Sequence, residues 1–373
     1  MVSACGRDGE RPTGTTAHAA RARGPARAVG TAAGLGLVAA LVTTLGPAGG
    51  ARAAAATTAI HDIQGAAHVS PLAGTSVTGV KGVVTATGGT GFWMQDPEPD
   101  HDPATSEGVF VYTKSAPTAV AGDAVTVGGT VTEYRPGGAD GANLSTTEIG
   151  SPDVTVTAHD VAPPAATVIG RAGRRPPGRV IDRGTHGDVE KTGTFRPRRA
   201  GIDFYESLEG MRVEMRDAVA VGPTNSYGET PVIGDGGRGA SVRTARGGIV
   251  MRAHDPNPER LIVAKGMAAV PAADTGDRYD RVTGVLDYDF GNFELLADHT
   301  PKRTDGGLAP ERTRAARHGQ LAFATFNVEN LSPKDPRSKF DALAAQVVTN
   351  LRPPTCCPSR RSRTTPGPRT TAW

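Results

Sequence analysis

Residues Ala124 to Tyr134 read A-V-T-V-G-G-T-V-T-E-Y, and this stretch decides the fold. Apolar and small polar residues alternate along it with the two-residue period of a β-strand that has one buried face. A similar alternation covers Val77 to Thr87, and shorter apolar runs stand at Gly91 to Gln95 and Gly108 to Tyr112. Four or five short strands within about a hundred residues predict a small closed barrel of the oligonucleotide/oligosaccharide-binding (OB) type.

A second β-rich block, at residues 202–296, repeats features of the first block at 60–164. Gly210 to Val221 (G-M-R-V-E-M-R-D-A-V-A-V) is similar to Val77 to Thr87. Arg281 to Tyr288 (R-V-T-G-V-L-D-Y) is similar to Gly129 to Tyr134. We interpret the pattern as a tandem repeat of one barrel-like module. The alternative is chance similarity between strands of like composition. The predicted fold class is therefore mainly β, with two OB-like barrel modules.

The composition changes between and after these blocks. Residues 165–201 are rich in Arg, Pro and Gly and are predicted to form a linker, and the polar residues 297–319 a second one. Leu321 to Thr325 then predicts a strand, and Lys339 to Leu351 an amphipathic helix. The apolar residues of this helix share one face: Phe340, Leu343, Ala344, Val347 and Leu351. A strand, a polar turn and a helix are how a layered α/β domain begins.

The formal net charge of +3 belongs to the two ends of the 373-residue chain. Met1 to Ala56 carries six Arg and two acidic residues, and Pro353 to Trp373 carries four Arg and no acidic residue. The remaining 31 basic and 36 acidic residues leave a net charge of −5. Total charge therefore gives little support for nucleic-acid binding, and only a local basic face would bind phosphates.

Residues 1–56 have the layout of a secretory signal peptide. Arg7 to Arg27 form a basic region, Ala28 to Leu45 is apolar, and small residues follow at Ala51 to Ala56. The alternative is a membrane anchor, but three glycines interrupt the apolar stretch. We expect cleavage near Ala56, secretion to the extracellular space, no stable membrane partner after cleavage, and a monomer. The three cysteines all lie outside the β-rich blocks, so these blocks need no disulfide framework: Cys5, Cys356 and Cys357.

Ala324 to Pro333 (A-T-F-N-V-E-N-L-S-P), followed by Lys339 to Val348 (K-F-D-A-L-A-A-Q-V-V), resembles the first strand and helix of the endonuclease/exonuclease/phosphatase family. The similarity is strongest to the secreted bacterial nucleases of that family. Earlier motifs resemble the OB-like module that precedes such nuclease domains: I-H-D-I-Q-G at Ile60 to Gly65, S-P-L-A-G at Ser70 to Gly74, and the span from Gly91 to Gly108. The resemblance implies that residues 320–352 begin a four-layer α/β sandwich that cuts phosphodiester bonds of DNA or RNA with Mg²⁺.

Within this resemblance, Asn327 matches the Asn of the family's first-strand motif. The match implies that its amide orients a catalytic carboxylate or an attacking water and contacts phosphate oxygens. The resemblance also places Glu329 and Asn330 beside the catalytic cleft. The alternative is that Asn327 and Asn330 only build the turn.

The final segment, Pro353 to Trp373, departs from the family pattern. Its low apolar content and clustered Arg are unlike a buried strand. The family's metal-binding Glu would follow the first helix, and no residue after Asn327 supplies this Glu, the catalytic Asp pair or the C-terminal His. Codons compatible with Ser359 to Trp373 encode, in another reading frame, a sequence that resembles the missing motif. We therefore expect a truncation by frameshift near Pro353, and no nuclease activity from this chain by itself.

A loop between two predicted strands gathers four carboxylates and a histidine, D-P-E-P-D-H-D at Asp96 to Asp102. Asp96, Asp100 and Asp102 are candidate ligands for Ca²⁺, which binds through oxygen atoms. The loop lacks the spacing of an EF-hand and contains two prolines, so a solvated acidic turn is the alternative. No P-loop, GxSxG, CxxC or HExxH motif occurs in the chain.

Two further groups are candidates for binding nucleic acid. Phe92, Trp93 and Tyr112 could stack on single-stranded bases, although strand alternation must send some aromatic side chains into the core. Three arginines in the Gly-rich segment Gly237 to Gly248 could meet phosphates, and an exposed hairpin is the alternative: Arg238, Arg243 and Arg246.

These observations support two classes of function. The first is the N-terminal part of a secreted, metal-dependent nuclease that is inactive by itself. The second is a non-catalytic module whose two barrels hold DNA, RNA or a surface polymer. A third and weaker interpretation is a cell-surface adhesion module that binds calcium in the acidic loop.

Overall fold

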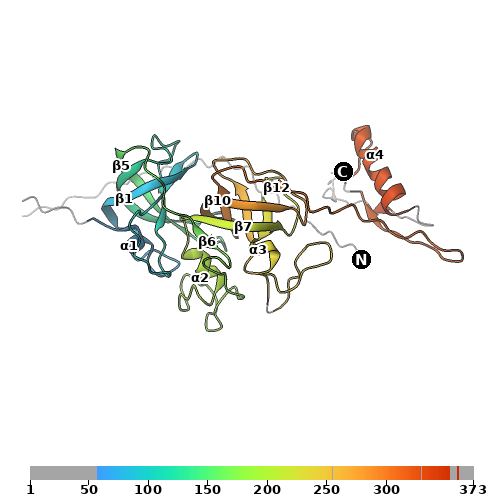
Figure 1. The fold of residues 1–373 in the computed structure, drawn as a ribbon, viewed down its shortest axis with the longest axis horizontal. Helices are drawn as coiled ribbons and strands as arrows, with labels where there is room; N and C mark the ends of the chain where they lie inside the picture. The colour runs from blue at the N-terminus through green and yellow to red at the C-terminus, as the bar shows by residue number, and fades with distance from the viewer. Residues whose placement is uncertain (1–56, 254, 329, 353–358, 361–373) are drawn as a thin grey trace, which may run out of the picture. The chain divides into compact units, whose positions relative to one another are not determined.

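The computed structural model describes residues 57–253, 255–328, 330–352 and 359–360 (Figure 1). The expected signal peptide, Glu329, the cysteines and nearly all of the expected aberrant tail lie outside these ranges. Within them the chain is mainly β, as its sequence predicts. None of the helices in the described part of the chain has the length and apolarity needed to span a bilayer.

The first module consists of a short helix followed by five strands that form a closed barrel. Its elements are α1 (Ile60–Gln64), β1 (Ser76–Thr87), β2 (Gly91–Gln95), β3 (Gly108–Tyr112), β4 (Ala124–Tyr134) and β5 (Thr146–Ala158). The strands follow the order β1-β2-β3-β5-β4, and β4 returns to β1. β3 and β5 run parallel, and the other neighbours are antiparallel. This is the closed barrel that the alternating sequence predicts.

The second module repeats this topology. Its elements are β6 (Thr167–Ile169), α2 (Gly201–Glu206), β7 (Arg212–Ala220), β8 (Thr230–Ile233), α3 (Gly234–Gly237), β9 (Leu261–Lys265), β10 (Arg278–Asp289), β11 (Asn292–Ala297) and β12 (Arg303–Thr304). The pairings β7-β8-β9-β11-β10 close into a ring because β10 also pairs with β7. β9 and β11 run parallel, which is the place that β3 and β5 take in the first ring.

The strand register also supports a tandem repeat. Gly129 in β4 lies opposite Val77, the second residue of β1, and Gly284 in β10 lies opposite Val213, the second residue of β7. A Cβ atom added to Gly129 would lie 2.5 Å from an atom of β5, and one added to Gly284 would lie 1.9 Å from β11. Both rings therefore leave no room for a side chain at equivalent places. The similar sequence segments belong to strands with equivalent positions in the two rings.

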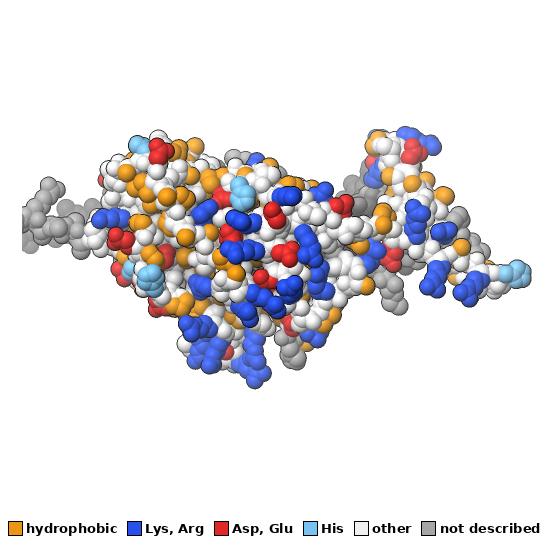
Figure 2. All heavy atoms as spheres, in the orientation of Figure 1, with side chains coloured by type: hydrophobic (Ala, Val, Ile, Leu, Met, Phe, Trp, Pro, Cys, Tyr) orange, Lys and Arg blue, Asp and Glu red, His pale blue; other side chains and the backbone are white. Residues whose placement is uncertain are grey.

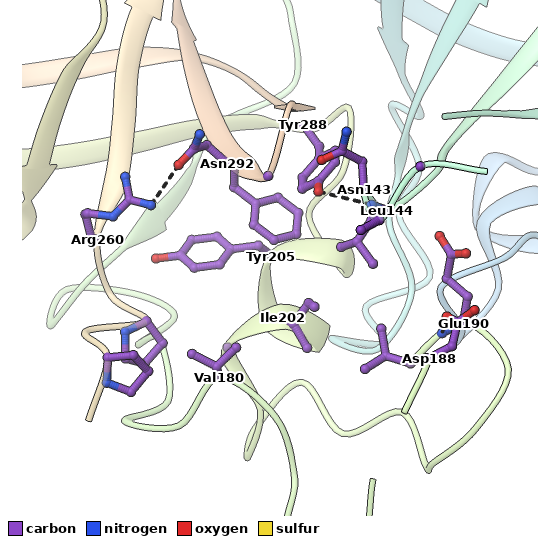
Figure 3. A pocket seen from close by; sticks show the side chains of 18 of the residues that line it. Asn143, Leu144, Val180, Asp188, Glu190, Ile202, Tyr205, Arg260, Tyr288 and Asn292 are labelled. Carbon is purple, nitrogen blue, oxygen red and sulfur yellow. Dashed lines mark hydrogen bonds between the residues drawn. The ribbon is translucent and has the colours of Figure 1, made fainter. Parts of the chain in front are cut away.

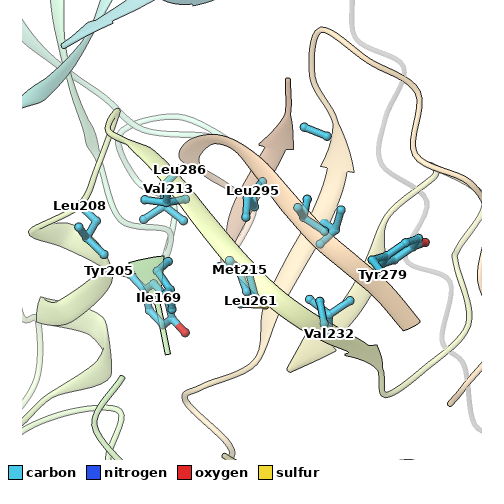
Figure 4. Close-up of a cluster of buried hydrophobic side chains, with 14 of the residues drawn as sticks. Ile169, Tyr205, Leu208, Val213, Met215, Val232, Leu261, Tyr279, Leu286 and Leu295 are labelled. Atoms are coloured by element: carbon cyan, nitrogen blue, oxygen red, sulfur yellow. The ribbon is translucent and has the colours of Figure 1, made fainter. Parts of the chain in front are cut away.

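Strand alternation fills the core of each module. The first core combines both isoleucines of α1 with inward-facing residues of all five strands, including Val80, Phe92, Val111, Val127 and Ile149. In the second module, side chains from β7 to β11 converge on one core (Figure 4). Tyr279 is fully buried there, and its hydroxyl donates a hydrogen bond to the Pro271 carbonyl at 2.5 Å, which compensates for burying the polar group.

Part of the predicted linker 165–201 is built into the second module. Strand β6 pairs in parallel with β7. The Arg174 guanidinium donates to the Ser207 hydroxyl at 2.7 Å and to the Pro103 carbonyl at 2.8 Å. This arginine thus ties the segment to both modules. The sequence did not predict this anchoring, because the segment has few apolar residues. Backbone pairing of β6 and the hydrogen bonds of Arg174 hold it instead.

Buried polar contacts join the two modules. The Gln95 side chain accepts the backbone N–H of Arg212 at 2.7 Å. The Ser106 hydroxyl donates to the Glu209 carbonyl at 2.6 Å, and the Glu209 carboxylate accepts the N–H of Thr147 at 2.8 Å. These residues come from loops and strand ends of both rings, so residues 57–305 pack as one body.

After β12 the chain forms β13 (Phe326–Asn327), α4 (Arg337–Ala345) and the π-helical turn η1 (Gln346–Asn350), and β13 pairs with β14 (Ser359–Arg360). The predicted helix is present as α4 and η1, whereas the predicted strand at Leu321 to Thr325 does not form, and the two-residue β13 follows it. No residue of α4 or η1 is buried, and Leu321 and Phe323 are 69% and 74% exposed. That this segment begins an α/β sandwich stays a prediction.

Candidate functional sites

The segment from residue 171 to 199 carries nine basic and three acidic residues. Asp182 pairs with Arg196 at 2.7 Å, and Asp188 pairs with Lys191 at 2.9 Å. Six other arginines of the segment are exposed and form no ion pair within the described part of the chain: Arg171, Arg175, Arg179, Arg183, Arg198 and Arg199. We call these six residues the arginine cluster.

The arginine cluster borders two hollows on the surface. One, of about 690 Å³, is lined mainly by residues 177–184 and 196–199. The other, of about 370 Å³, lies between residues 196–199 and the β2–β3 loop. Figure 2 shows Lys and Arg side chains gathered at the lower edge of the view, over the loops beside α2. Burial lowers the pKa of Arg174, and the nearby positive charge of Arg198 lowers it further, as expected where cations outnumber acids.

The aromatic candidates divide between the inside and the outside of the first barrel. Phe92 is fully buried in the core, so its assignment as a stacking residue is wrong. Trp93 packs outside against Phe110, with ring centroids 4.8 Å apart, and Tyr112 is half-buried two residues further along β3. OB barrels use this outer face of their second and third strands for ligands. Trp93 and Tyr112 therefore remain candidates.

The three arginines of the Gly-rich segment make different contacts. Arg243 donates to the Gly247 carbonyl at 3.0 Å, so it braces its own loop. Arg246 donates to the Ala309 carbonyl at 2.9 Å. Arg238 is exposed at the C-terminal end of α3. The Gly-rich segment belongs to the irregular connection between α3 and β9, and two of its three arginines already bind backbone carbonyls.

The aspartates of the acidic loop build turns. Asp96, Asp100 and Asp102 each accept the backbone N–H of the residue two positions on, at 2.7 to 2.9 Å. This is the geometry of Asx turns. Among the described residues, one group of three ligand-type side chains brings its donor atoms within 4.8 Å of one another, and it contains only one of these aspartates: His61, Asp100 and Glu107.

His61 of α1 and Glu107, just before β3, were not recognised from the sequence. His61 Nδ1 lies 3.4 Å from Glu107 Oε2, and the other oxygen of Glu107 accepts the N–H of Asp100 at 2.8 Å. Burial raises the pKa of Glu107. Burial also acts to raise the pKa of Asp100, but hydrogen bonds from Asp102 and Thr105 lower it. The three residues are separated by up to 46 positions, so no local motif marks them.

A cavity of about 670 Å³ lies where the β4–β5 loop, α2 and the β10–β11 turn meet (Figure 3). The rings of Tyr205 and Phe293 stack with centroids 5.1 Å apart, and Arg260 donates to the Asn292 amide oxygen at 2.8 Å. The buried hydroxyl of Tyr205 has no hydrogen-bond partner in the described part of the chain. Several separate segments line this cavity, so the sequence offered no signal for it.

A buried histidine lies in the same region between the modules. His68 Nε2 is 2.8 Å from Asp203, and Nδ1 is 3.3 Å from Glu206. Burial acts to lower the pKa of His68, but the two carboxylates outweigh it and raise the pKa to about 9. Burial raises the pKa of Glu206 to about 7. This ionic contact ties the chain ahead of β1 to α2.

The nuclease-like segment is only partly described. Asn327 lies in β13 with an exposed side chain, and Glu329 falls outside the described residues. The geometry of a catalytic pair at these positions therefore stays a prediction.

One family matches part of the chain. Its description is "Domain of unknown function (DUF8508)", and the match covers residues 168–305. It begins within β6 and ends one residue after β12, so it contains the arginine cluster together with the second ring. No curated protein and no solved structure matches the chain.

Proposed function

We propose that residues 57–305 form a non-catalytic binding module that holds single-stranded nucleic acid by its phosphate backbone. The observation that carries this proposal is the arginine cluster. Its six exposed cations form no ion pairs within the described residues. The segment that carries them is fixed in place by β6 and Arg174. The rest of the body is acidic, so this local excess of positive charge would set where a polyanion docks.

Arginine is suited to this role because its planar guanidinium can donate two parallel hydrogen bonds to one phosphate. Each phosphate that a cation neutralises releases bound counterions. The binding constant for a single strand then falls with salt by a log–log slope of about −0.7 per contact. If four of the six arginines engage, the slope is about −3. The fixed segment would also lose less conformational entropy on binding than a free linker.

The outer face of β2 and β3 supports a single strand over a duplex. Trp93 and Tyr112 lie there, and stacking of an unpaired base on an aromatic ring contributes about 1–3 kcal/mol. A base within a duplex cannot reach such rings. The arginine cluster would therefore supply affinity, and the aromatic face would supply the preference for unpaired bases.

The resemblance of Ala324 to Pro333 to a nuclease motif supports a related proposal. We infer that the module belongs to the front part of a secreted, Mg²⁺-dependent nuclease and delivers substrate to it. Asn327 and Glu329 are the catalytic positions that this resemblance supplies in the chain.

Fluorescence anisotropy with labelled single-stranded DNA and RNA, over salt from about 50 to 200 mM, tests the binding proposal. The double variant Arg198→Ala/Arg199→Ala should bind at least about tenfold more weakly at low salt, with a slope shallower by about 1.4. The matched control is Arg312→Ala/Arg314→Ala, which removes two exposed arginines outside the cluster. Equal affinity of wild type and cluster variant would refute the proposal, as would binding that does not depend on salt.

A cleavage assay separates binding from catalysis. The pure chain with Mg²⁺ should leave labelled DNA and RNA intact while still binding them. Cleavage that depends on Mg²⁺ and disappears in Asn327→Ala would show instead that the chain is itself a nuclease.

A further inference from the structure

We propose that His61, Asp100 and Glu107 bind one divalent transition-metal ion, with Zn²⁺ as the representative ion, at the end of the first barrel. The site is distinct from the arginine cluster and does not depend on nucleic-acid binding. It also differs from the calcium site expected in the acidic loop, because it takes one aspartate of that loop and adds an imidazole and a buried carboxylate.

The fold holds the histidine in place. Ile60 and Ile63 of α1 are fully buried in the core, and the Gln64 side chain donates to the Gly108 carbonyl at 2.6 Å. These contacts pin α1 against the start of β3. His61, between the two isoleucines, is half-buried and faces Glu107.

The carboxylates are also held. Glu107 is 4% exposed, and one of its oxygens accepts the N–H of Asp100, while the other faces His61. The Thr105 hydroxyl donates to Asp100 at 2.9 Å. A metal ion would therefore meet ligands whose rotamers are already restricted, as a preformed site requires.

The spacing fits metal ligation better than a direct hydrogen bond. His61 Nδ1 and Glu107 Oε2 are 3.4 Å apart, beyond the usual range for a hydrogen bond. Two ligands at about 2.1 Å from a tetrahedral zinc ion lie about 3.4 Å from each other. The donor atoms of all three residues lie within 4.8 Å of one another, so a small shift of the Asp100 side chain would complete the set.

The donor chemistry selects the class of ion. One imidazole nitrogen and two carboxylate oxygens suit Zn²⁺ or a similar transition ion, whereas Ca²⁺ takes six to eight oxygen ligands. Three protein ligands leave a coordination position for water. The ion would also compensate the charge of the buried Glu107 carboxylate beside Asp100, which is otherwise costly to keep ionised.

Isothermal titration of the metal-stripped full chain with Zn²⁺, combined with thermal unfolding, tests the site. We expect one strong site and a rise in Tm with Zn²⁺ but none with Ca²⁺. His61→Asn and Glu107→Gln should each weaken Zn²⁺ binding at least about tenfold, because even residues that only support a ligand contribute that much. Binding should also weaken as pH falls, since protons compete for the ligands.

The matched controls are His101→Asn and Asp102→Asn, which change another histidine and another carboxylate in the adjacent loop and should bind Zn²⁺ like wild type. Both ligand variants should stay close to the Tm of metal-free wild type, because Gln has the size of Glu and the side chain of His61 is only half-buried. Zn²⁺ binding that persists unchanged in His61→Asn and Glu107→Gln would assign the ion to other histidines or cysteines and overturn the proposal. Stabilisation by Ca²⁺ alone would overturn it as well.

Discussion

At the scale of single residues, the contact between the modules keeps the buried His68 protonated. Burial alone would favour a neutral imidazole, yet Asp203 and Glu206 hold it between two carboxylates and raise its pKa to about 9. The folded pKa thus exceeds the unfolded value of about 6.5. Protonated His68 therefore stabilises the folded protein fully at pH values below the pKa of His68 in the unfolded chain. This contribution is lost as pH rises through the pKa of His68 in the folded protein.

We therefore expect His68 to make the protein less stable as pH rises from about 6.5 to 9, by about 3 kcal/mol at most. Urea unfolding at several pH values measures this loss. The variant His68→Gln should show a flatter pH profile over that range. His318→Gln serves as the control, because His318 is exposed and forms no ion pair with another residue of the described part of the chain. A profile of His68→Gln that parallels wild type would contradict the assignment.

At the scale of elements, the glycines of β4 and β10 reveal why the two rings share a pattern. Gly129 and Gly284 occupy equivalent places in the fourth strand of each ring, where an added Cβ atom would collide with the fifth strand. The similar sequence segments therefore come from strands at equivalent places in the two rings. The register shifts in the pairing of β4 with β5 are not visible in the sequence.

Replacing Gly284 by Ala should destabilise the protein by ~3 kcal/mol, because the new methyl group would meet the Leu296 carbonyl of β11. The free energy of unfolding in urea checks this expectation. Gly89→Ala is the matched control, since a Cβ there meets nothing within 4 Å, and its stability should stay within about 0.5 kcal/mol of wild type. Similar free energies of unfolding for both variants would show that β10 and β11 can move apart to accept the methyl group.

At the scale of the whole molecule, the two modules meet through backbone as well as side chains. A Cβ atom added to Gly108 would lie 2.2 Å from the carbonyl carbon of Gly210. Glycine at the start of β3 thus lets the barrel approach the second ring closely. Together with the buried hydrogen bonds of Gln95, Ser106 and Glu209, this contact couples the modules.

Calorimetry should therefore show one cooperative unfolding transition for both modules. Gly108→Ala would push the modules apart and should split this transition in two or lower its Tm by several degrees, whereas Gly89→Ala should not. Two independent transitions in wild type would mean that the contact carries little energy.

The sequence predicted strands β2, β3 and β4 with the boundaries that they have, because two-residue alternation is a local signal. The sites were predicted less well. Trp93 and Phe92 are neighbours in sequence, and alternation separates their faces without saying which face lies inside. Ring closure puts Phe92 in the core.

The sequence by itself determined the mainly β class, the bounds of β2, β3 and β4, and the presence of a helix near the C-terminal end of the described chain. Only the tertiary structure decided that the arginine-rich segment is anchored by β6 and Arg174, and that His61 meets Asp100 and Glu107. The physical reason is the distance along the chain over which each signal acts. Alternation and turn residues act over a few positions, whereas these sites form from residues brought together when strands far apart in the chain pair and close a ring.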